Sequence, residues 1–327
     1  MKDVLADGLG RKIEYMRISV TDKCNLRCRY CMPEERVKSV AHEDLLTYEE
    51  IAFVTGILAE MGVCKVRLTG GEPLVRKDIA ELVDKLHSTK GIETIAMTSN
   101  GVLLKSMLPE LVSSGLNEVN ISLDTLNADH FERITRTACL NDVLDGIDSA
   151  ITYGLKVKLN CVPCRELNDE DILEVAEMAQ DKKLDVRFIE LMPIGQGKLY
   201  TGISSDLILE RLTLKHGTPK ELPYDGQGPA RYYSFDGFNG RIGFISPISH
   251  MFCSSCNRIR LMPEGMLKPC LYYPDGLDIR GMLRRGEKKE IIKTAVTEML
   301  QRKHKEHGFG NGDTGNAEEK RMNQIGG

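Results

Sequence analysis

The stretch Cys64-Lys-Val-Arg-Leu-Thr-Gly-Gly-Glu-Pro73 decides the fold, because it reads as a short strand that ends in a glycine turn. The apolar residues of 78–88 then have helical spacing, so the unit has the order strand, turn, helix. Five other strands are expected, with helical segments between them. Such alternation predicts a parallel sheet with helical crossovers, here an α/β fold of the incomplete (βα)6 barrel type. The other five strands are expected at 15–20, 92–98, 117–123, 156–162 and 184–190.

The composition of the 327 residues excludes several classes of protein. A net charge of −4 argues against a general nucleic-acid binder, which carries a basic excess. The chain has no apolar run of about 18 residues, so no membrane span is expected. Its first residues lack the apolar core of a secretory signal, and the ten cysteines should therefore be mostly reduced. We expect a cytoplasmic protein.

Six of the ten cysteines form two groups of three, Cys24-x3-Cys28-x2-Cys31 and Cys253-x2-Cys256-x13-Cys270. Thiolates bind both zinc and iron–sulfur clusters. A structural zinc site or an ordinary [4Fe–4S] cluster takes four protein ligands, whereas each group here supplies three. One iron of each cluster would then be open to a small molecule. A zinc-stabilised binding module without catalysis is the alternative.

The first group, Cys24-Asn-Leu-Arg-Cys28-Arg-Tyr-Cys31, resembles the signature of the radical S-adenosylmethionine (SAM) superfamily. The resemblance implies a [4Fe–4S] cluster on these three cysteines whose open iron chelates SAM. Reductive cleavage of SAM would give a 5′-deoxyadenosyl radical. It also implies the partial barrel of this superfamily, with SAM contacts at five positions. These are Tyr30, Gly71, Glu72, Ser122 and Met192.

Arg258 and Arg260 lie between the later cysteines and would share one face of an extended segment. Two guanidinium groups suit an anionic or purine ligand. With the radical SAM loop and the Gly-Gly C-terminus, this group resembles the GTP 3′,8-cyclases of molybdenum cofactor biosynthesis. The resemblance implies a second [4Fe–4S] cluster on Cys253, Cys256 and Cys270 that positions GTP. The implied product is (8S)-3′,8-cyclo-7,8-dihydroguanosine 5′-triphosphate, formed after hydrogen abstraction from the ribose 3′ carbon.

Basic residues alternate along two expected strands, as Lys65 and Arg67 and as Lys156 and Lys158. Alternate residues share a face, and unpaired charges are not buried for packing alone, so a lumen that binds a triphosphate is predicted. Some of these cations could instead lie on the outer face, with their charged ends in solvent. The resemblance implies GTP contacts at eight positions. These are Arg17, Lys65, Arg67, Thr98, Lys158, Arg187, Arg258 and Arg260.

Three regions are expected, namely a barrel at 1–230, a second-cluster region at 231–303, which begins with a hairpin, and a tail at 304–327. The tail is polar and glycine-rich, which predicts a flexible tether. The resemblance gives a catalytic role to Arg17 and to the final Gly326 and Gly327, which would insert near it. The remaining cysteines are predicted to be incidental. They are Cys64, Cys139, Cys161 and Cys164.

The resemblance further implies an external one-electron donor, a homodimer, and a downstream cyclic pyranopterin monophosphate synthase that accepts the product. No nucleic-acid or membrane partner is expected. The alternative function is a radical SAM peptide-modifying enzyme with an auxiliary cluster. Such enzymes usually have more C-terminal cysteines than this chain and need no triphosphate pocket.

Overall fold

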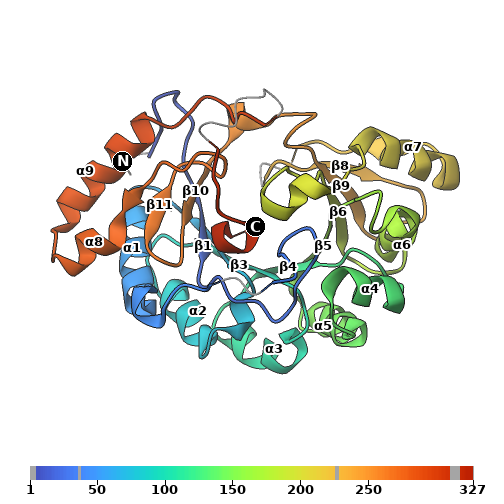
Figure 1. The fold of residues 1–327 in the computed structure, drawn as a ribbon, viewed down its shortest axis with the longest axis horizontal. Coiled ribbons are helices and arrows are strands. Elements are labelled where there is room, and N and C mark those ends of the chain that lie inside the picture. The colour runs from blue at the N-terminus through green and yellow to red at the C-terminus, as the bar shows by residue number, and fades with distance from the viewer. Residues whose placement is uncertain (1–4, 36–37, 225–227, 310–316, 327) are drawn as a thin grey trace.

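Six parallel strands in sequence order form the centre of the molecule (Figure 1). The computed structural model describes residues 5–35, 38–224, 228–309 and 317–326. The six strands expected from the sequence are all present, with ends shifted by at most two residues. They are β1 (Tyr15–Ser19), β2 (Lys65–Thr69), β3 (Thr94–Ser99), β4 (Glu118–Ser122), β5 (Lys156–Cys161) and β6 (Asp185–Ile189).

Helices cover the outer face of this curved sheet (Figure 1). A capping box between Thr47 and Glu50 starts the first helix, where each residue accepts a backbone N–H of the other. The helix that precedes β6 begins at Ile172, after a short 3-10 turn. The covering helices are α1 (Tyr48–Glu60), α2 (Ile79–His87), α3 (Leu104–Ser113), α4 (Ala128–Thr135), α5 (Leu140–Thr152) and α6 (Ile172–Asp181).

The C-terminal region extends both edges of the six-stranded sheet. β9 (Arg241–Ile245) pairs in parallel with β6, and β10 (Arg258–Leu261) pairs in parallel with β1. The hairpin expected near 231–245 is present, as β8 (Arg231–Ser234) and β9. Its place beside β6 was not expected from the sequence, nor was β10. The further elements are β7 (Lys220–Glu221), β11 (Met266–Lys268), β12 (Leu277–Asp278), α7 (Ser205–His216), α8 (Ile279–Arg284), α9 (Lys289–Gln301) and α10 (Met322–Ile325).

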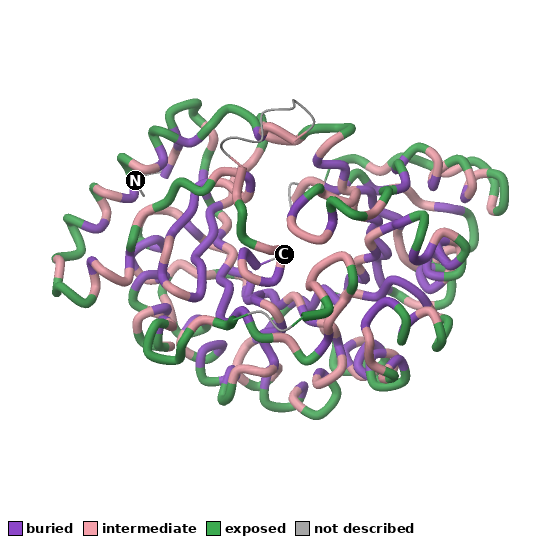
Figure 2. The backbone as a smooth tube through the Cα atoms, viewed as in Figure 1, coloured by how far each residue is buried: buried purple, intermediate pink, exposed green. Residues whose placement is uncertain are grey.

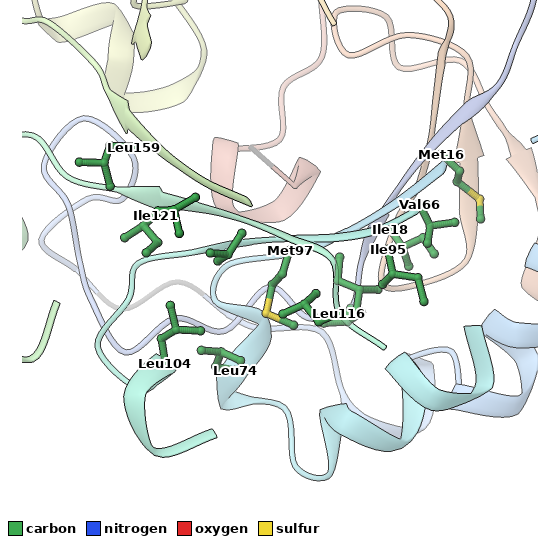
Figure 3. Packing of buried hydrophobic residues seen from close by; sticks show 14 of the residues in the cluster. Met16, Ile18, Val66, Leu74, Ile95, Met97, Leu104, Leu116, Ile121 and Leu159 are labelled. Carbon is green, nitrogen blue, oxygen red and sulfur yellow. The ribbon is translucent and has the colours of Figure 1, made fainter. Parts of the chain in front are cut away.

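The main core lies between the sheet and its helices. Met16, Ile18, Val66 and Met97 are buried on the strands, and Leu104 of α3 belongs to the same cluster (Figure 3). Because side chains alternate along a strand, the intervening residues point to the opposite, inner face. Buried backbone accordingly follows the strands, and the exposed backbone follows the outer helices (Figure 2). None of the described helices has both the length and the apolarity to cross a membrane.

Part of the tail packs against the rest of the molecule. The ring of His307 is buried, with Nε2 2.6 Å from the carbonyl oxygen of Pro247. Glu318 forms an ion pair with Lys268, and both side chains are buried. α10 then lies inside the ring of strands (Figure 1). The described parts of the expected tether, 304–309 and 317–320, therefore have fixed contacts.

Candidate active site

One pocket of about 360 Å³ lies within the ring of strands. Its lining combines the inner face of the six-stranded sheet, both cysteine groups and α10. Among the described residues, the expected site positions that do not line it are Lys65 and Gly326, and Gly327 lies outside the described residues. The expected residues that line it are Arg17, Cys24, Cys28, Tyr30, Cys31, Arg67, Gly71, Glu72, Thr98, Ser122, Lys158, Arg187, Met192, Cys253, Cys256, Arg258, Arg260 and Cys270.

The glycines after β2 let two backbone segments meet beside the first cysteine group. The Gly71 N–H donates to the carbonyl of Thr21 at 2.7 Å, and the Glu72 N–H donates to that of Lys23 at 2.8 Å. A Cβ atom on Gly71 would lie 2.3 Å from the Lys23 carbonyl oxygen, so any side chain would force the segments apart. This contact fixes the chain immediately before Cys24.

The first three cysteines are free, half-buried thiols. Burial raises the pKa of Cys24 to about 11 and that of Cys31 to about 12. The pKa of Cys28 is well above its ordinary value, from burial and then from the charges of Cys31, Asp124 and Cys24. Because metal binds to thiolates and not to thiols, metal binding by these three cysteines must release protons. Three soft donors that line one pocket and whose charges act on one another fit an iron–sulfur cluster with one open iron, which spans a wider set of ligands than a single metal ion.

The second group differs because cations surround it. Burial raises the pKa of Cys256, but the charges of Arg258 and Lys303 outweigh this and lower it to about 6. The Lys303 Nζ lies 3.7 Å from the Cys256 Sγ. Cys256 is therefore poised as a thiolate ligand. No three Cys, His, Asp or Glu side chains in the described part of the chain meet closely enough to bind a single metal ion.

Tyr30, expected near SAM, has a partner that sequence reasoning missed. Its hydroxyl donates to Asp124 Oδ2 at 2.7 Å, and burial raises the pKa of Asp124 to about 6. Burial likewise raises the pKa of Glu72 to about 7. The Glu72 carboxylate accepts the N–H of Asn100 at 2.6 Å, which ties the ends of β2 and β3 together. Their position in the sequence was the signal that could have revealed these partners, since Asn100 and Asp124 lie one and two residues after the ends of β3 and β4.

The inner face of the sheet carries polar groups suited to a ligand. Thr98 and Asn120 are register neighbours, and the Thr98 Oγ1 and Asn120 Oδ1 are buried without a hydrogen-bond partner among the described residues. Both residues line the pocket. The Arg187 guanidinium donates to Asn160 Oδ1 at 2.6 and 3.0 Å. Since buried polar atoms are normally satisfied, Thr98 and Asn120 indicate a polar ligand at this wall.

The expected cations do converge, but they are not all unpaired. Lys65, Arg67 and Lys158 surround the carboxylate of Glu118, a partner that the sequence did not reveal. Lys156, at the start of β5, is exposed. Arg17 is the register neighbour of both Arg67 and Arg260. The wall therefore remains strongly basic.

The tail enters this basic region. The Arg260 Nη1 donates to the Gly326 carbonyl oxygen at 3.2 Å, and the Asn323 Nδ2 donates to that of Asp22 at 3.1 Å. Gly326 has a φ of 71°, which favours glycine, and an added Cβ would lie 3.0 Å from the Cβ of Ser19. The penultimate glycine is thus held beside Arg260, which is itself next to Arg17.

Each of the two cysteine groups lies within a stretch of the chain that matches a known sequence family. Residues 18–179 match the Radical SAM superfamily, and residues 184–309 match Molybdenum Cofactor Synthesis C. A GTP 3′,8-cyclase of Peptoclostridium acidaminophilum is 45% identical over 317 residues, covering 95% of this chain and 96% of that protein. One from Desulforamulus reducens is 42% identical over 328 residues, covering 99% and 100%. The chain belongs to the GTP 3′,8-cyclase family.

Comparison with a solved structure supports the fold independently of the family. Streptococcus suis SuiB bound to precursor peptide SuiA superimposes with a TM-score of 0.59 at 17% identity, covering 79% of this chain and 60% of that one. At this identity the likeness concerns the fold alone. The α/β partial barrel of the radical SAM type is confirmed, as are the family and the enzyme class predicted from the sequence. The full-length relatives favour the cyclase over the peptide-modifying alternative.

The four remaining cysteines lie apart from this site. Cys161 is buried in the main core with Leu159, on the helix-facing side of β5. Cys164 belongs to a smaller apolar cluster. The Cys161 Sγ lies 3.5 Å from the Asn168 Nδ2. Neither residue is among the described residues that line the pocket, so neither contributes a ligand to it.

Proposed function

We propose that this chain is itself a GTP 3′,8-cyclase, which makes (8S)-3′,8-cyclo-7,8-dihydroguanosine 5′-triphosphate in the first step of molybdenum cofactor biosynthesis. The observation that carries the proposal is that two separate groups of three cysteines line one basic pocket. Two ligand sets of this kind suit a reaction in which one site generates a radical and the other holds the substrate. The full-length relatives support the same activity.

The proposed cofactors are SAM and two [4Fe–4S] clusters. Cys24, Cys28 and Cys31 would hold the first cluster, and the other three cysteines of the pocket would hold the second. When bound, the first cluster with SAM supplies the radical chemistry, and the second supplies an open iron for the guanine. The role of the protein is to orient both ligands and to exclude water from the pocket.

We assign the residues around the pocket to the two ligands. Five positions on the side of the first cysteine group would contact SAM, namely Tyr30, Gly71, Glu72, Ser122 and Met192. Cations on the inner face would contact GTP. Lys158, Arg67 and Arg187 suit the phosphates, because charge-assisted hydrogen bonds to phosphate are strong. The other assigned GTP contacts are Arg17, Lys65, Thr98, Arg258 and Arg260.

The tail is proposed to complete the pocket. The hydrogen bond from Arg260 to Gly326 supports a catalytic role for the Gly-Gly end, with Gly327 beyond the described residues. We further propose an external one-electron donor, a homodimer and a cytoplasmic location. A cyclic pyranopterin monophosphate synthase would accept the product.

Metal analysis tests the cofactors of this proposal. Anaerobically reconstituted protein should contain about eight iron atoms per chain with acid-labile sulfide. Zinc without sulfide would instead support a structural binding module.

The Cys256→Ala variant tests the division of labour between the two cysteine groups. This variant should still cleave SAM to 5′-deoxyadenosine but should form no cyclised product from GTP. Full cyclase activity in the variant would contradict the two-cluster proposal.

A further inference from the structure

Three cations from two strands converge on a single carboxylate of β4. The Lys65 Nζ lies 3.1 Å from Glu118 Oε1, and Arg67 Nη2 lies 3.4 Å from Oε2. The Lys158 Nζ lies 3.1 Å from the same Oε2. Every side chain in this cluster is at most 16% exposed. Three positive charges against one negative charge leave the cluster cationic.

The register of the sheet explains how these side chains meet. Arg67, Ala96 and Glu118 are successive neighbours across β2, β3 and β4, so their side chains share the inner face. Ala96 carries only a methyl group and is fully buried. Arg67 can therefore cross β3, where its Nη1 also donates to the Met97 carbonyl at 3.3 Å. A larger residue at 96 would separate the guanidinium from the carboxylate.

Glu118 lies behind the cations, as seen from the pocket. Arg67 and Lys158 line the pocket, whereas Lys65 and Glu118, the first residues of β2 and β4, are not among its described lining. A bound anion would thus meet the cations and not the carboxylate. Glu118 can hold the cations in place without itself contacting that anion.

The charge of Glu118 also bears on whether Lys158 carries a proton. Burial lowers the pKa of Lys158 to about 8. Glu118 opposes this, while the charges of Arg187 on β6, Lys156 on β5 and Arg67 on β2 lower the pKa further. Burial would raise the pKa of Glu118, but the three cations reduce it to about 2, so its charge persists. Without that charge, the pKa of Lys158 would fall further, and the side chain would be largely neutral at pH 8.

We propose that Glu118 is a positioning residue for phosphate binding, which holds Arg67 and Lys158 at the pocket wall and keeps Lys158 protonated until the substrate phosphates replace it as counter-charge. The inference rests on the proposed function, in which these cations bind the phosphates of GTP. It adds a residue that does not itself touch the substrate. It also predicts a link between GTP binding and proton uptake.

The Glu118→Gln variant tests the link, because it keeps the shape of the side chain and removes its charge. Calorimetry of the reconstituted enzyme in buffers of different ionisation enthalpy gives both the Kd for GTP and the protons taken up. At about pH 8 the Kd should rise about tenfold, and the variant should take up as much as about half a proton more than the wild type, in which Lys158 is already about half unprotonated at this pH. At about pH 6.5 the rise in the Kd for GTP should be only about threefold or less. Binding of guanosine, which lacks phosphates, should not change.

Three further variants isolate the cause. Glu60→Gln is the matched control, since Glu60 pairs with Lys289 and Lys293 on the surface, and it should bind GTP as the wild type does. Glu118→Asp keeps the charge and should keep the wild-type proton uptake. Adding Lys158→Arg to Glu118→Gln should abolish the extra uptake, because a guanidinium keeps its proton.

Two outcomes would overturn the inference. One is a Glu118→Gln enzyme that binds GTP as tightly as, or more tightly than, the wild type with the same proton uptake. If Glu118→Gln does not fold, the second is a Lys158→Arg enzyme that, at about pH 8, takes up as many protons with GTP as the wild type, in which about half of Lys158 is unprotonated at that pH. A wild-type enzyme that cleaves SAM but does not bind GTP would overturn the proposed function instead, and this inference with it.

Discussion

At the residue scale, Gly71 is constrained by the carbonyl oxygen that faces it. Replacing Gly71 with Ala would place a methyl group 2.3 Å from the Lys23 carbonyl oxygen, and the backbone before Cys24 would have to move. We expect the Gly71→Ala enzyme to lose the first cluster, which is about four of its about eight iron atoms. It should then no longer cleave SAM. Iron analysis and 5′-deoxyadenosine formation measure both.

Gly56 provides the matched control for that substitution. It lies within α1, where an added Cβ would meet no heavy atom within 4 Å. Gly56→Ala should therefore keep its iron and gain up to about 1 kcal/mol of helix stability. A Gly71→Ala enzyme with full iron content and normal SAM cleavage would show that the close approach does not position the first cluster.

Tyr30 and Asp124 lead to a pH-dependent prediction. Burial raises the pKa of folded Asp124 to about 6, above its ordinary 3.8, so ionising this carboxyl destabilises the fold as pH rises through that window. The Tyr30 hydroxyl offsets part of this cost by donating to the carboxylate. Tyr30→Phe should lower the unfolding free energy by about 1–3 kcal/mol at pH 8. The loss should be smaller near pH 5, where Asp124 is protonated.

Anaerobic thermal unfolding at the two pH values measures this difference. Tyr233→Phe is a suitable control, because Tyr233 lies on β8 and is not among the described residues that line the pocket. An equal loss of stability for Tyr30→Phe at both pH values would argue against an ionised Asp124 as the partner of Tyr30.

At the scale of elements, the tail is anchored by a charge pair. Lys268 on β11 and Glu318 are both buried, so Glu318→Gln would leave the lysine without its counter-charge. Breaking a buried pair costs about 3–5 kcal/mol, which the tail can avoid by undocking. We expect cyclised product to fall at least about tenfold relative to 5′-deoxyadenosine, since that cost far exceeds the roughly 1.4 kcal/mol of a tenfold change.

The control for the tail is the more exposed pair between Lys320 and Glu264. Because exposed ion pairs contribute at most about 1 kcal/mol, Glu264→Gln should leave the ratio of product to 5′-deoxyadenosine nearly unchanged. An unchanged ratio in Glu318→Gln would mean that the docked tail is not needed for coupling SAM cleavage to cyclisation.

The sequence predicted the elements better than their partners. Periodicity located the six strands and most helices, because alternation and helical spacing are local properties. The four-residue β10 escaped notice, since its strand character depends on parallel pairing with β1, over 240 residues earlier. Glu118 was missed for a similar reason. A glutamate at the start of a strand reads as exposed, and only the small Ala96 between β2 and β4 reveals its place among the cations.

At the scale of the whole molecule, one chain closes around its own pocket from both ends. β10 pairs with β1 and β9 pairs with β6, which covers both edges of the six-stranded sheet. This arrangement brings the late cysteines beside the first strand and opposite the early cysteine loop. Two motifs more than 200 residues apart in sequence thereby share one lumen, which is what a reaction between SAM and a second bound substrate requires.

The central claim is that the two cysteine groups serve one reaction on GTP. The most direct measurement is anaerobic turnover of the reconstituted enzyme with reductant, SAM and GTP deuterated at the ribose 3′ carbon. The account predicts GTP consumption with one deuterium transferred into each 5′-deoxyadenosine. Formation of 5′-deoxyadenosine without deuterium, while GTP remains intact, would contradict it.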